Sequence, residues 1–351
     1  MVNLLNVTPA EAARALEELV ATRGDAPYRA RQAHRWLWTR PAAGWEHATD
    51  LPAGLQDHLQ SRAPLARLTL ATRQTSRDGT VKSLWQLPDG LTVESVWIPE
   101  GRRTTLCISS QAGCAFRCRF CATGRMGLAR HLDPWEIAAQ IREMVLDPEF
   151  GVPSNVVFMG MGEPLHNWRG VDTALTILNQ ADGLGIGARR ITVSTIGLIP
   201  RLEQLARRPE QFRLAVSLHA GSGARRAALM PIERKYPLDR LIPVLRRFRK
   251  RITLEYVLIR HHNDADQDAR DLAGIARDLG ALVNLLPLHP GGAGDLRPSP
   301  TGRIAGFAAL LRDRGVRVTV RRSRGLDIAA ACGQLRTETL NDRPRRVPES
   351  P

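Results

Sequence analysis

Short apolar runs that resemble β-strands alternate with amphipathic helical runs from about residue 104 onward. The strand candidates are TTLCIS, SNVVFMG, RRITVST, FRLAVSL, ITLEYVLI, ALVNLLPL and VRVTVRR. Helical patterns such as DPWEIAAQIREMVL, PLDRLIPVLRRFRK and DARDLAGIARDLG lie between them. Strand–helix alternation at this spacing predicts an α/β fold of parallel βαβ units, arranged either as an open sheet or as a barrel.

Several of these strand candidates end in residues whose side chains can bind a ligand. Functional residues of a βα barrel lie at the C-terminal ends of its strands. Taken singly, each of these positions is also an ordinary turn or capping residue, so only their convergence would carry meaning. The positions are Gly160, Met161, Gly162 and Glu163 after VVFM, Ser194 and Thr195 after ITV, Ser217, Leu218 and His219 after LAV, and Asn284 after ALV.

The N-terminal region has a helical pattern. Thr8 can cap a helix, Pro9 suits its first position, and Glu11 completes a capping box. A second helix is predicted over YRARQAHRWLWTR, where Trp36 and Trp38 are better explained by packing in a small helical core than by base stacking. We therefore expect a helical accessory domain over residues 1–65.

Three further segments complete the predicted organisation. A β-rich connecting segment spans residues 66–99, with turns at SRDGT and LPDG. The α/β core spans residues 100–327, and a C-terminal segment spans residues 328–351. The polar, proline-rich end of that segment, TETLNDRPRRVPESP, is expected to be disordered.

The charge of the chain indicates a polyanionic partner. Lys and Arg number 50 against 35 Asp and Glu, a formal net charge of +15. Nucleic acid is the first expectation and an anionic membrane surface the second. Arginine enrichment from a GC-rich genome is the alternative, in which case the charges only solvate the surface. The predicted helix over residues 28–40, with its four arginines, is the main candidate for an RNA contact.

Neither a signal peptide nor a membrane span is visible in the sequence. The N-terminus has no basic segment followed by a long apolar run. No segment approaches the roughly 18–20 apolar residues that a membrane span needs. We therefore expect a cytoplasmic protein with no membrane partner. Thiols stay reduced in that compartment, where clustered cysteines bind metal or react more often than they form disulfides.

Three of the five cysteines lie in GCAFRCRFCATG, with the spacing Cys114-x3-Cys118-x2-Cys121. A structural zinc site uses four ligands, and neither Cys107 nor His131 lies at the usual paired spacing for the fourth. Iron–sulfur clusters also use thiolate ligands, typically four, so a cluster held by three would leave one iron open, as a catalytic site requires. The residue types favour an iron–sulfur cluster over zinc, and zinc over free thiols.

This cysteine spacing, in the first βα loop of a βα-repeat domain, resembles that of the radical S-adenosylmethionine (SAM) enzymes. In those enzymes SAM chelates the open iron of a 4Fe-4S cluster, and the reduced cluster cleaves SAM to a 5′-deoxyadenosyl radical. The motif MGMGEP resembles the stretch that contacts the SAM amino group. The resemblance implies Cys114, Cys118 and Cys121 as cluster ligands, and an external electron donor.

A longer series of motifs narrows the resemblance. TLCISSQAGCAFRCRFCATG, FMGMGEPL, ITVSTIG, AVSLHA, LMPIERKYPL, VNLLP and DIAAACGQL occur in this order. Over residues 93–335 they resemble the RlmN/Cfr family of radical SAM RNA methyltransferases, closest to the RlmN branch, which methylates an adenine of large-subunit ribosomal RNA. The resemblance implies a partial (βα)6-type radical SAM barrel and a monomeric enzyme. The helical N-terminal region resembles the accessory domain of that family.

Two cysteines outside the cluster match family residues that take part in the reaction. Cys332 matches the cysteine that accepts a methyl group from one SAM. A radical from a second SAM then activates this methyl group, which adds to adenine and joins the protein covalently to the RNA. Cys107 matches the cysteine that resolves the adduct and ends in a disulfide with Cys332. Both would act as thiolates, which a depressed pKa or a nearby base would favour.

The remaining site residues follow from the same resemblance. Glu94, in TVESVWIP, matches a glutamate assigned as a proton acceptor, although its spacing alone would place it on the exposed face of an alternating strand. A carboxylate and an amide suit the amino and ribose groups of SAM. The implied SAM contacts are Gly162, Glu163, Ser194, Ser217, Leu218, His219 and Asn284.

The resemblance leaves the methylated carbon open. One branch of the family modifies carbon 2 of adenine, in some members in tRNA as well, and the Cfr branch modifies carbon 8. GEP favours carbon 2, whereas CATG and STIG occur in both branches. The loop LLPLHPGGAGDLRPSP lacks aromatic residues that some relatives carry there, so substrate choice could differ.

Two alternatives come from other functional classes. One is a non-methylating iron–sulfur electron-transfer protein, and the other is a zinc-stabilised RNA-binding protein. Neither explains Cys332 or the SAM-like motifs.

Overall fold

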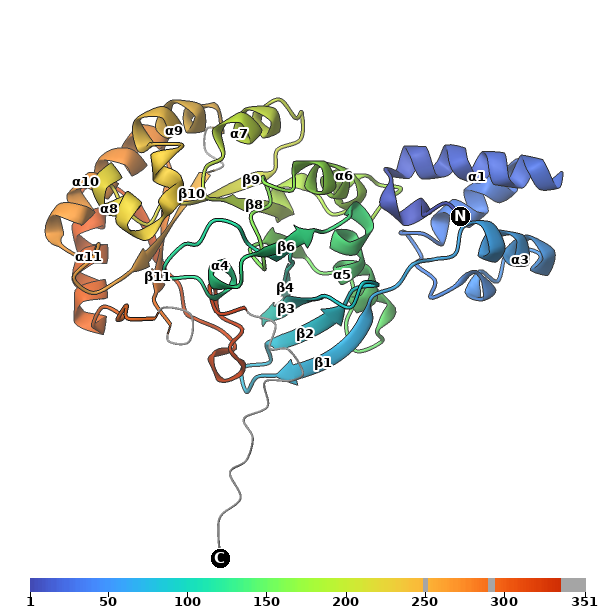
Figure 1. Cartoon of the computed structure of the whole chain (residues 1–351), viewed down its shortest axis with the longest axis horizontal. Helices are drawn as coiled ribbons and strands as arrows, with labels where there is room; N and C mark the ends of the chain where they lie inside the picture. The colour runs from blue at the N-terminus through green and yellow to red at the C-terminus, as the bar shows by residue number, and fades with distance from the viewer. Residues whose placement is uncertain (249–251, 290–293, 336–351) are drawn as a thin grey trace, which may run out of the picture.

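The computed structural model describes residues 1–248, 252–289 and 294–335 (Figure 1). The polar tail that the sequence predicts to be disordered lies outside the described residues. Within them, none of the helices combines the length and the apolar character needed to cross a membrane.

The N-terminal region is helical, and its first helix begins as predicted. Glu11 donates its backbone N–H to the Thr8 hydroxyl, and the Glu11 carboxylate accepts from the Thr8 backbone at 2.9 Å. Trp38 is buried, which confirms the packing interpretation, whereas Trp36 donates to Asp50 at 2.6 Å. The helices are η1 (Leu4–Asn6), α1 (Pro9–Arg23), α2 (Tyr28–Arg35), η2 (Trp45–His47) and α3 (Ala53–Arg62).

Three antiparallel strands continue the chain and form one end of the main sheet. They are β1 (Thr69–Thr75), β2 (Val81–Gln86) and β3 (Thr92–Glu100). The two predicted turns lie between them, and Gly79 and Gly90 have φ values of 80° and 84°, a backbone region that favours glycine. Strand β3 pairs with β4 (Arg103–Cys107), which begins the parallel part of the sheet.

All seven predicted strands of the core are present and parallel. After β4 they are β7 (Asn155–Phe158), β8 (Ile191–Thr195), β9 (Arg213–Ser217), β10 (Ile252–Leu258), β11 (Leu282–Pro287) and β12 (Arg317–Val320). The described strands form one sheet in the order β1-β2-β3-β4-β7-β8-β9-β10-β11-β12. This order begins and ends at different strands, so the sheet is an open, partial barrel and the predicted α/β fold class is confirmed.

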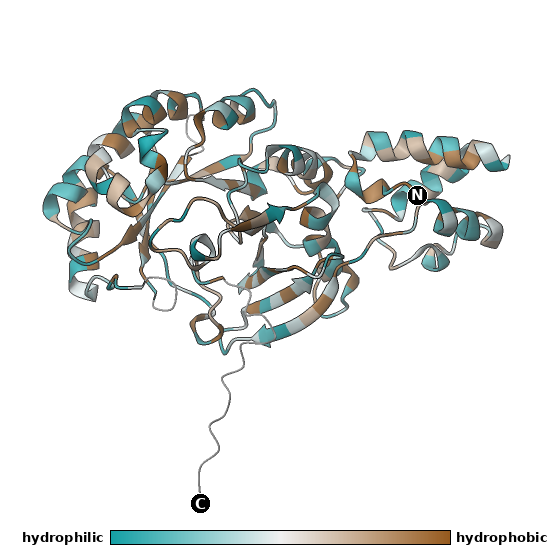
Figure 2. Ribbon diagram, viewed as in Figure 1, coloured by the Kyte–Doolittle hydropathy of each residue, from teal (hydrophilic) through white to brown (hydrophobic). Residues whose placement is uncertain are grey.

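Helices connect the parallel strands and cover the outer face of the sheet (Figure 1). Figure 2 shows hydrophobic residues on the central strands, alternating bands on β1 and β2, and hydrophilic residues on the outward faces of these helices. This distribution places the core between sheet and helices. The described helices that follow β4 in the chain, of which α4 follows the cysteine loop and η6 follows the last strand, are α4 (Ala122–Met126), α5 (Pro134–Leu146), α6 (Trp168–Asn179), η3 (Ala188–Arg190), α7 (Ile199–Ala206), α8 (Gly223–Leu229), η4 (Pro231–Arg234), α9 (Leu238–Leu245), η5 (Arg246–Phe248), α10 (Asp266–Leu279), α11 (Thr301–Asp313) and η6 (Leu326–Ile328).

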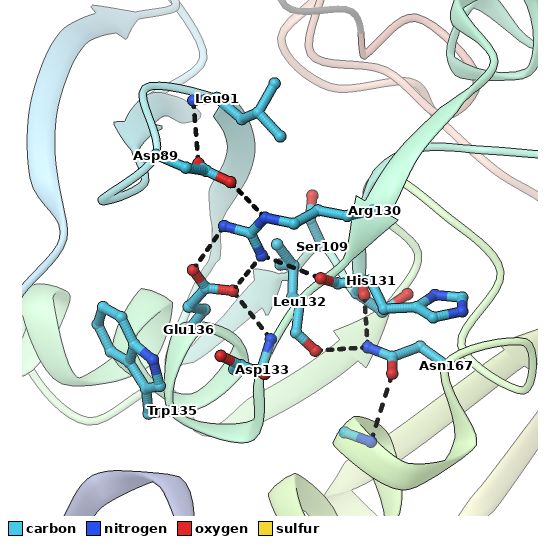
Figure 3. Close-up of polar contacts among 12 residues, drawn as sticks. Asp89, Leu91, Ser109, Arg130, His131, Leu132, Asp133, Trp135, Glu136 and Asn167 are labelled. Atoms are coloured by element: carbon cyan, nitrogen blue, oxygen red, sulfur yellow. Dashed lines mark hydrogen bonds and ion pairs between the residues drawn. The ribbon is translucent and has the colours of Figure 1, made fainter. Parts of the chain in front are cut away.

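A small hairpin brackets the cysteine-rich loop. Strands β5 (Gln111–Gly113) and β6 (Leu128–His131) pair antiparallel, and the loop and α4 lie between them. Arg130 on β6 binds both carboxylate oxygens of Glu136 on α5, at 2.7 and 2.8 Å, and also binds Asp89 in the β2–β3 turn (Figure 3). The Asn167 side-chain amide donates to the carbonyls of Ser110 and Leu132. The hairpin is thereby fixed to α5 and to the edge of α6.

Candidate active site

One cavity opens at the C-terminal ends of the parallel strands and contains most of the predicted site residues. All three clustered cysteines line it, together with Cys332. It also contains three phenylalanines, which exclude water from part of its wall. The lining residues on which the following description depends are Cys114, Phe116, Cys118, Phe120, Cys121, Gly160, Gly162, Glu163, Ser194, Ser217, His219, Glu255 and Cys332.

The cysteine loop runs from the end of β5 to the start of α4. Cys118 is buried, whereas Cys114 and Cys121 are half-buried. Cys114 donates its backbone N–H to Gly127 at 2.7 Å, which closes the loop against the β5–β6 hairpin. Burial raises the pKa of all three thiols, to about 12 for Cys114, so the binding of a metal there would displace protons. Within the described residues no three His, Cys, Asp or Glu side chains are grouped closely enough to hold a single metal ion.

Glycines in MGMGEP let the backbone pass close to the β4–β5 connection. A Cβ at Gly160 would lie 2.7 Å from the Ile108 carbonyl, and one at Gly162 would lie 2.5 Å from the Gln111 side chain. Gly162 also has a φ of 98°, which L side chains rarely adopt. The path of this loop therefore depends on both glycines, and it places Glu163 in the cavity wall.

Glu163 joins the ends of two neighbouring strands. Its carboxylate accepts from the backbone N–H groups of Leu165, at 3.0 Å, and Ile196, at 2.9 Å. Burial raises its pKa to about 7, against the opposing effect of these hydrogen bonds and of Thr195. A carboxylate fixed in this way can still accept a hydrogen bond from a cationic amino group in the cavity.

The end of β9 supplies Ser217, Leu218 and His219, of which the first and last line the cavity. Leu218 is fully buried, and its predicted contact is limited to the backbone, whose N–H donates to the Glu255 carbonyl at 3.1 Å. His219 has a φ of 56° and accepts from the Val257 backbone N–H through Nδ1 at 3.0 Å. Its ring packs edge-on against Phe120, and burial lowers its pKa to about 3.

Asn284 lies in β11, in register with Glu255 on β10. The Asn284 amide donates to Glu255 Oε2 at 2.8 Å, and it is Glu255, not Asn284, that lines the cavity. Burial raises the pKa of Glu255, and the charge of Arg321 and the hydrogen bond from Asn284 partly oppose this shift. The predicted role of Asn284 therefore involves a buried carboxylate that the sequence interpretation did not include.

The two cysteines outside the cluster face a second, smaller cavity. Cys107 is buried and lines only this one, whereas Cys332 is exposed and lines both. Arg321 lines the same smaller cavity and donates from Nη1 to Cys332 Sγ at 3.3 Å. Burial and the neighbouring Cys332 raise the pKa of Cys107 to about 12, and Arg321 opposes this shift. A depressed pKa for Cys107, which its predicted role would favour, is therefore not found.

Glu94 is buried, so its assignment to an exposed strand face from spacing alone is wrong. Strand β3 lies between β2 and β4, which leaves it no free edge. The Glu94 carboxylate lies 3.1 Å from Lys82 Nζ on β2, and the Ser109 hydroxyl donates to the Glu94 carbonyl at 2.6 Å. Glu94 is not among the residues that line either cavity.

Three residues of the site escaped the sequence interpretation. Glu255 is a charged residue inside the apolar strand ITLEYVLI, a pattern that could have identified it. Arg321 follows β12 in a run of arginines, so nothing local distinguishes it. Gln111 is fully buried, accepts from the Glu163 backbone N–H at 2.8 Å and contacts the rings of His131 and His166.

Two family models match the chain. The radical SAM superfamily matches residues 108–273, which contain the cysteine loop and β7 to β10. The ribosomal RNA large subunit methyltransferase N-terminal domain matches residues 2–65, the helical region.

Curated relatives match over nearly the whole chain. A protein from Gemmatimonas aurantiaca, named probable dual-specificity RNA methyltransferase RlmN, is 52% identical over 99% of this chain and 95% of its own length. The dual-specificity RNA methyltransferase RlmN of Anaeromyxobacter dehalogenans is 46% identical over 94% and 92%. A crystal structure of a radical SAM methyltransferase from Sphaerobacter thermophilus superposes with a TM-score of 0.88 at 43% identity, covering 96% of this chain and 99% of that one. The chain described here belongs to the RlmN-type radical SAM methyltransferase family.

Proposed function

We propose that this protein methylates carbon 2 of an adenine in 23S ribosomal RNA, and in tRNA, through an S-methylcysteine and a covalent protein–RNA adduct. The observation that carries the proposal is the position of Cys332. Cys332 lines the cavity of the three clustered cysteines and also the smaller cavity that contains Cys107. One sulfur can therefore face the SAM site on one side and a second thiol on the other.

The donor set suits the two cofactors that the family implies, a 4Fe-4S cluster and SAM. The three clustered thiols line a single cavity, together with two carboxylates, three hydroxyls and two imidazoles. When bound, the cluster and two molecules of SAM per turnover would supply a methyl group and a radical. Cys114, Cys118 and Cys121 would hold the cluster. Gly162, Glu163, Ser194, Ser217 and His219 would hold SAM, and Leu218 and Asn284 would support that wall.

The remaining residues have distinct proposed tasks. Cys332 carries the methyl group, and Cys107 displaces the product by forming a disulfide with Cys332. The guanidinium of Arg321 stabilises negative charge on either sulfur, because it is a cation beside both. Glu94 is the proposed proton acceptor, and Lys82 holds its carboxylate.

Basic residues and the accessory helices support RNA as the substrate. Arg31 and Arg40 are exposed on and just after α2, whereas Arg35 pairs with Asp50 at 3.0 Å. Replacing Arg31 and Arg40 with Gln should flatten the salt dependence of RNA binding, by about 0.9 of a log unit for each duplex phosphate that the variant no longer neutralises. If the RNA affinity of the native protein did not change with salt concentration, the positive net charge would have to be explained by genome composition.

The proposed RNA substrates can be tested directly. Mass spectrometry of ribosomal RNA and tRNA after reaction identifies the modified carbon, and a methyl group on carbon 8 would assign the protein to the Cfr-type reaction. We also propose that the protein is a monomer and receives electrons from a donor outside the chain. Both points rest on the family resemblance.

Substitution of individual cysteines tests the assignment of the cluster ligands. Native protein purified without oxygen should be brown, with about four irons per chain. Cys118→Ala should lose both the iron and the formation of 5′-deoxyadenosine from SAM, whereas Cys332→Ala, the matched control, should keep both. A colourless protein with bound zinc, or unchanged SAM cleavage in Cys118→Ala, would overturn the assignment.

A further inference from the structure

The β1–β2 turn contacts the segment that carries Cys332. The turn consists of residues 76–80, and we call residues 324–335 the carrier segment. The two are about 250 residues apart in the chain. Nothing in the composition of the turn, SRDGT, indicates more than a hairpin connection.

Two carboxylates join the turn and the carrier segment reciprocally. Asp327 of the carrier segment accepts from the Ser76 hydroxyl at 2.6 Å and from the Arg77 backbone N–H at 3.2 Å. Asp78 of the turn accepts from the Gly325 backbone N–H at 3.1 Å, and Arg324 lies 4.0 Å from the same oxygen. Each element thus provides a carboxylate that binds a backbone N–H of the other.

Close packing accompanies these hydrogen bonds. Gly325 has a φ of 61°, and a Cβ there would lie 3.0 Å from the Thr80 methyl group and 2.8 Å from the Ala330 Cβ. Ser76 and Thr80 are buried, although both belong to a turn. The carrier segment therefore lies directly on the turn.

The other end of the carrier segment is attached to α4. The Thr123 hydroxyl donates to the Leu335 carbonyl at 2.6 Å, and the Ala122 N–H donates to the Gly333 carbonyl at 2.8 Å. Between the two attachments Ala330 and Ala331 are buried, whereas Cys332 is exposed. Cys332 is thus held between one attachment at the turn and one beside the cysteine loop.

The hairpin does not depend on these contacts for its own shape. Ser76 donates its backbone N–H to the Thr80 carbonyl at 2.8 Å, and Thr80 donates to Asp78 Oδ1 at 3.0 Å. Asp327 takes no part in either bond, and it is exposed. Its hydrogen bonds to the turn therefore act mainly on the carrier segment.

We propose that Asp327 and Asp78 are positioning residues that hold Cys332 where its sulfur can meet both the SAM site and Cys107. The inference rests on the proposed function. Fixing a segment before reaction removes conformational freedom that would otherwise have to be lost in each step. A released carrier segment would keep its attachment at α4 but would sample many positions, so the effective concentration of Cys332 near Cys107 would fall.

The first measurement is the equilibrium between the two thiols and their disulfide in glutathione buffers. Glutathione disulfide takes two electrons and two protons from Cys107 and Cys332, and two reduced glutathione molecules form. Mass spectrometry quantifies the joined peptides. Asp327→Ala and Ser76→Ala should each lower the equilibrium constant by about tenfold, because the effective concentration of the thiol pair falls. The double variant should lose little more than Asp327→Ala alone, since that change already removes the hydrogen bond between Ser76 and Asp327.

Activity provides the second measurement. Asp327→Ala should cleave SAM at the native rate but form methylated RNA about tenfold more slowly, since only steps at Cys332 depend on the position of its segment. Asp182→Ala, which removes another exposed carboxylate, should leave both rates and the disulfide equilibrium unchanged. Thermal unfolding checks that the variants are folded.

The two proposals fail in different ways. If the native protein methylated no RNA, the proposed function would be wrong, yet the disulfide equilibrium would still test the role of Asp327. If Asp327→Ala and Ser76→Ala kept both the native equilibrium and the native methylation rate, the positioning role would be excluded while the function stood.

Discussion

The guanidinium of Arg321 lies 3.3 Å from the sulfur of Cys332, measured from Nη1 to Sγ, and it also opposes the rise in the pKa of Cys107 that burial causes. One cation therefore serves the two thiols that the proposed reaction joins. A cation stabilises a thiolate, which is the nucleophilic form of cysteine.

Replacement of Arg321 should slow disulfide formation between the two cysteines. Arg321→Gln removes the cation, so the pKa of Cys107 should rise further and less thiolate should exist at any given pH. A rise of one unit lowers the thiolate fraction on the order of tenfold. The rate of disulfide formation measured against pH should shift to higher pH in Arg321→Gln and remain near the native profile in Arg321→Lys. Identical profiles for the Gln variant and the native protein would show that Arg321 does not act on these thiols.

Replacing each of the two cysteines outside the cluster should stop the proposed reaction at a different step. Cys332→Ala has no sulfur to methylate, so neither methylated protein nor methylated RNA should form. Cys107→Ala keeps Cys332 and should stall with RNA attached to it, because the thiol that would release the product is absent. A denaturing gel would show a nuclease-sensitive conjugate for Cys107→Ala alone. Free methylated RNA without any conjugate in that variant would remove Cys107 from the mechanism and leave it a buried apolar residue.

His219 should make the protein less stable in acid. Burial and then the charge of Arg226 lower its pKa from 6.5 to about 3, so its contribution to stability is complete above pH 6.5 and is lost as the pH falls toward 3. Each pH unit in that window costs about 1.4 kcal/mol, or roughly 2 kcal/mol between pH 6.5 and pH 5.

His219→Asn should remove this dependence while preserving local structure. Asparagine can accept the Val257 hydrogen bond and tolerates a positive φ. Urea unfolding at several pH values should show a smaller loss of stability in acid for this variant than for the native protein. His261→Asn is the matched control, because His261 also has a positive φ but is exposed, and its slope should equal the native one.

Gly160 should not tolerate a side chain. A Cβ there would lie 2.7 Å from the Ile108 backbone, which cannot rotate away, so Gly160→Ala should destabilise the protein by about 1–3 kcal/mol. Gly274→Ala, in α10 with open space around it, should instead stabilise by up to about 1 kcal/mol. Equal Tm values for the two variants would contradict the close approach of the MGMGEP loop to β4.

Much of the fold is predictable because its signals are local. Each strand of the core is a short apolar run, and each following helix has an apolar face, so type and order can be inferred without tertiary information. The start of α1 at Pro9 is equally local, because Thr8 and Glu11 form the capping box within a single turn. The cysteine spacing lies within one loop, and the structure places all three residues in one cavity wall.

What the sequence interpretation missed depends on pairing between distant strands. Glu94 alternates as an exposed residue would, but it is buried in a strand that is flanked on both sides, and its carboxylate pairs with Lys82 on β2. Arg321 follows β12, the last strand of the sheet, and comes close to Cys332 because the chain turns back after that strand. The hydrogen bonds of the Asp78 and Asp327 carboxylates could not be predicted either, because they join segments that are about 250 residues apart in the sequence.

Strand order in the main sheet has a consequence for how the protein is made. Each parallel strand from β8 to β12 pairs with the one synthesised just before it, so the sheet can grow at a single edge as the chain leaves the ribosome, N-terminal part first (Figure 1). The contact between Ser76 and Asp327 spans 251 residues and must wait for nearly the whole chain. A nascent or prematurely terminated chain would therefore already have its cysteine loop and much of its cavity wall but not Cys332. Unfinished molecules would then present the proposed cofactor site without the cysteine that the proposed adduct with RNA requires.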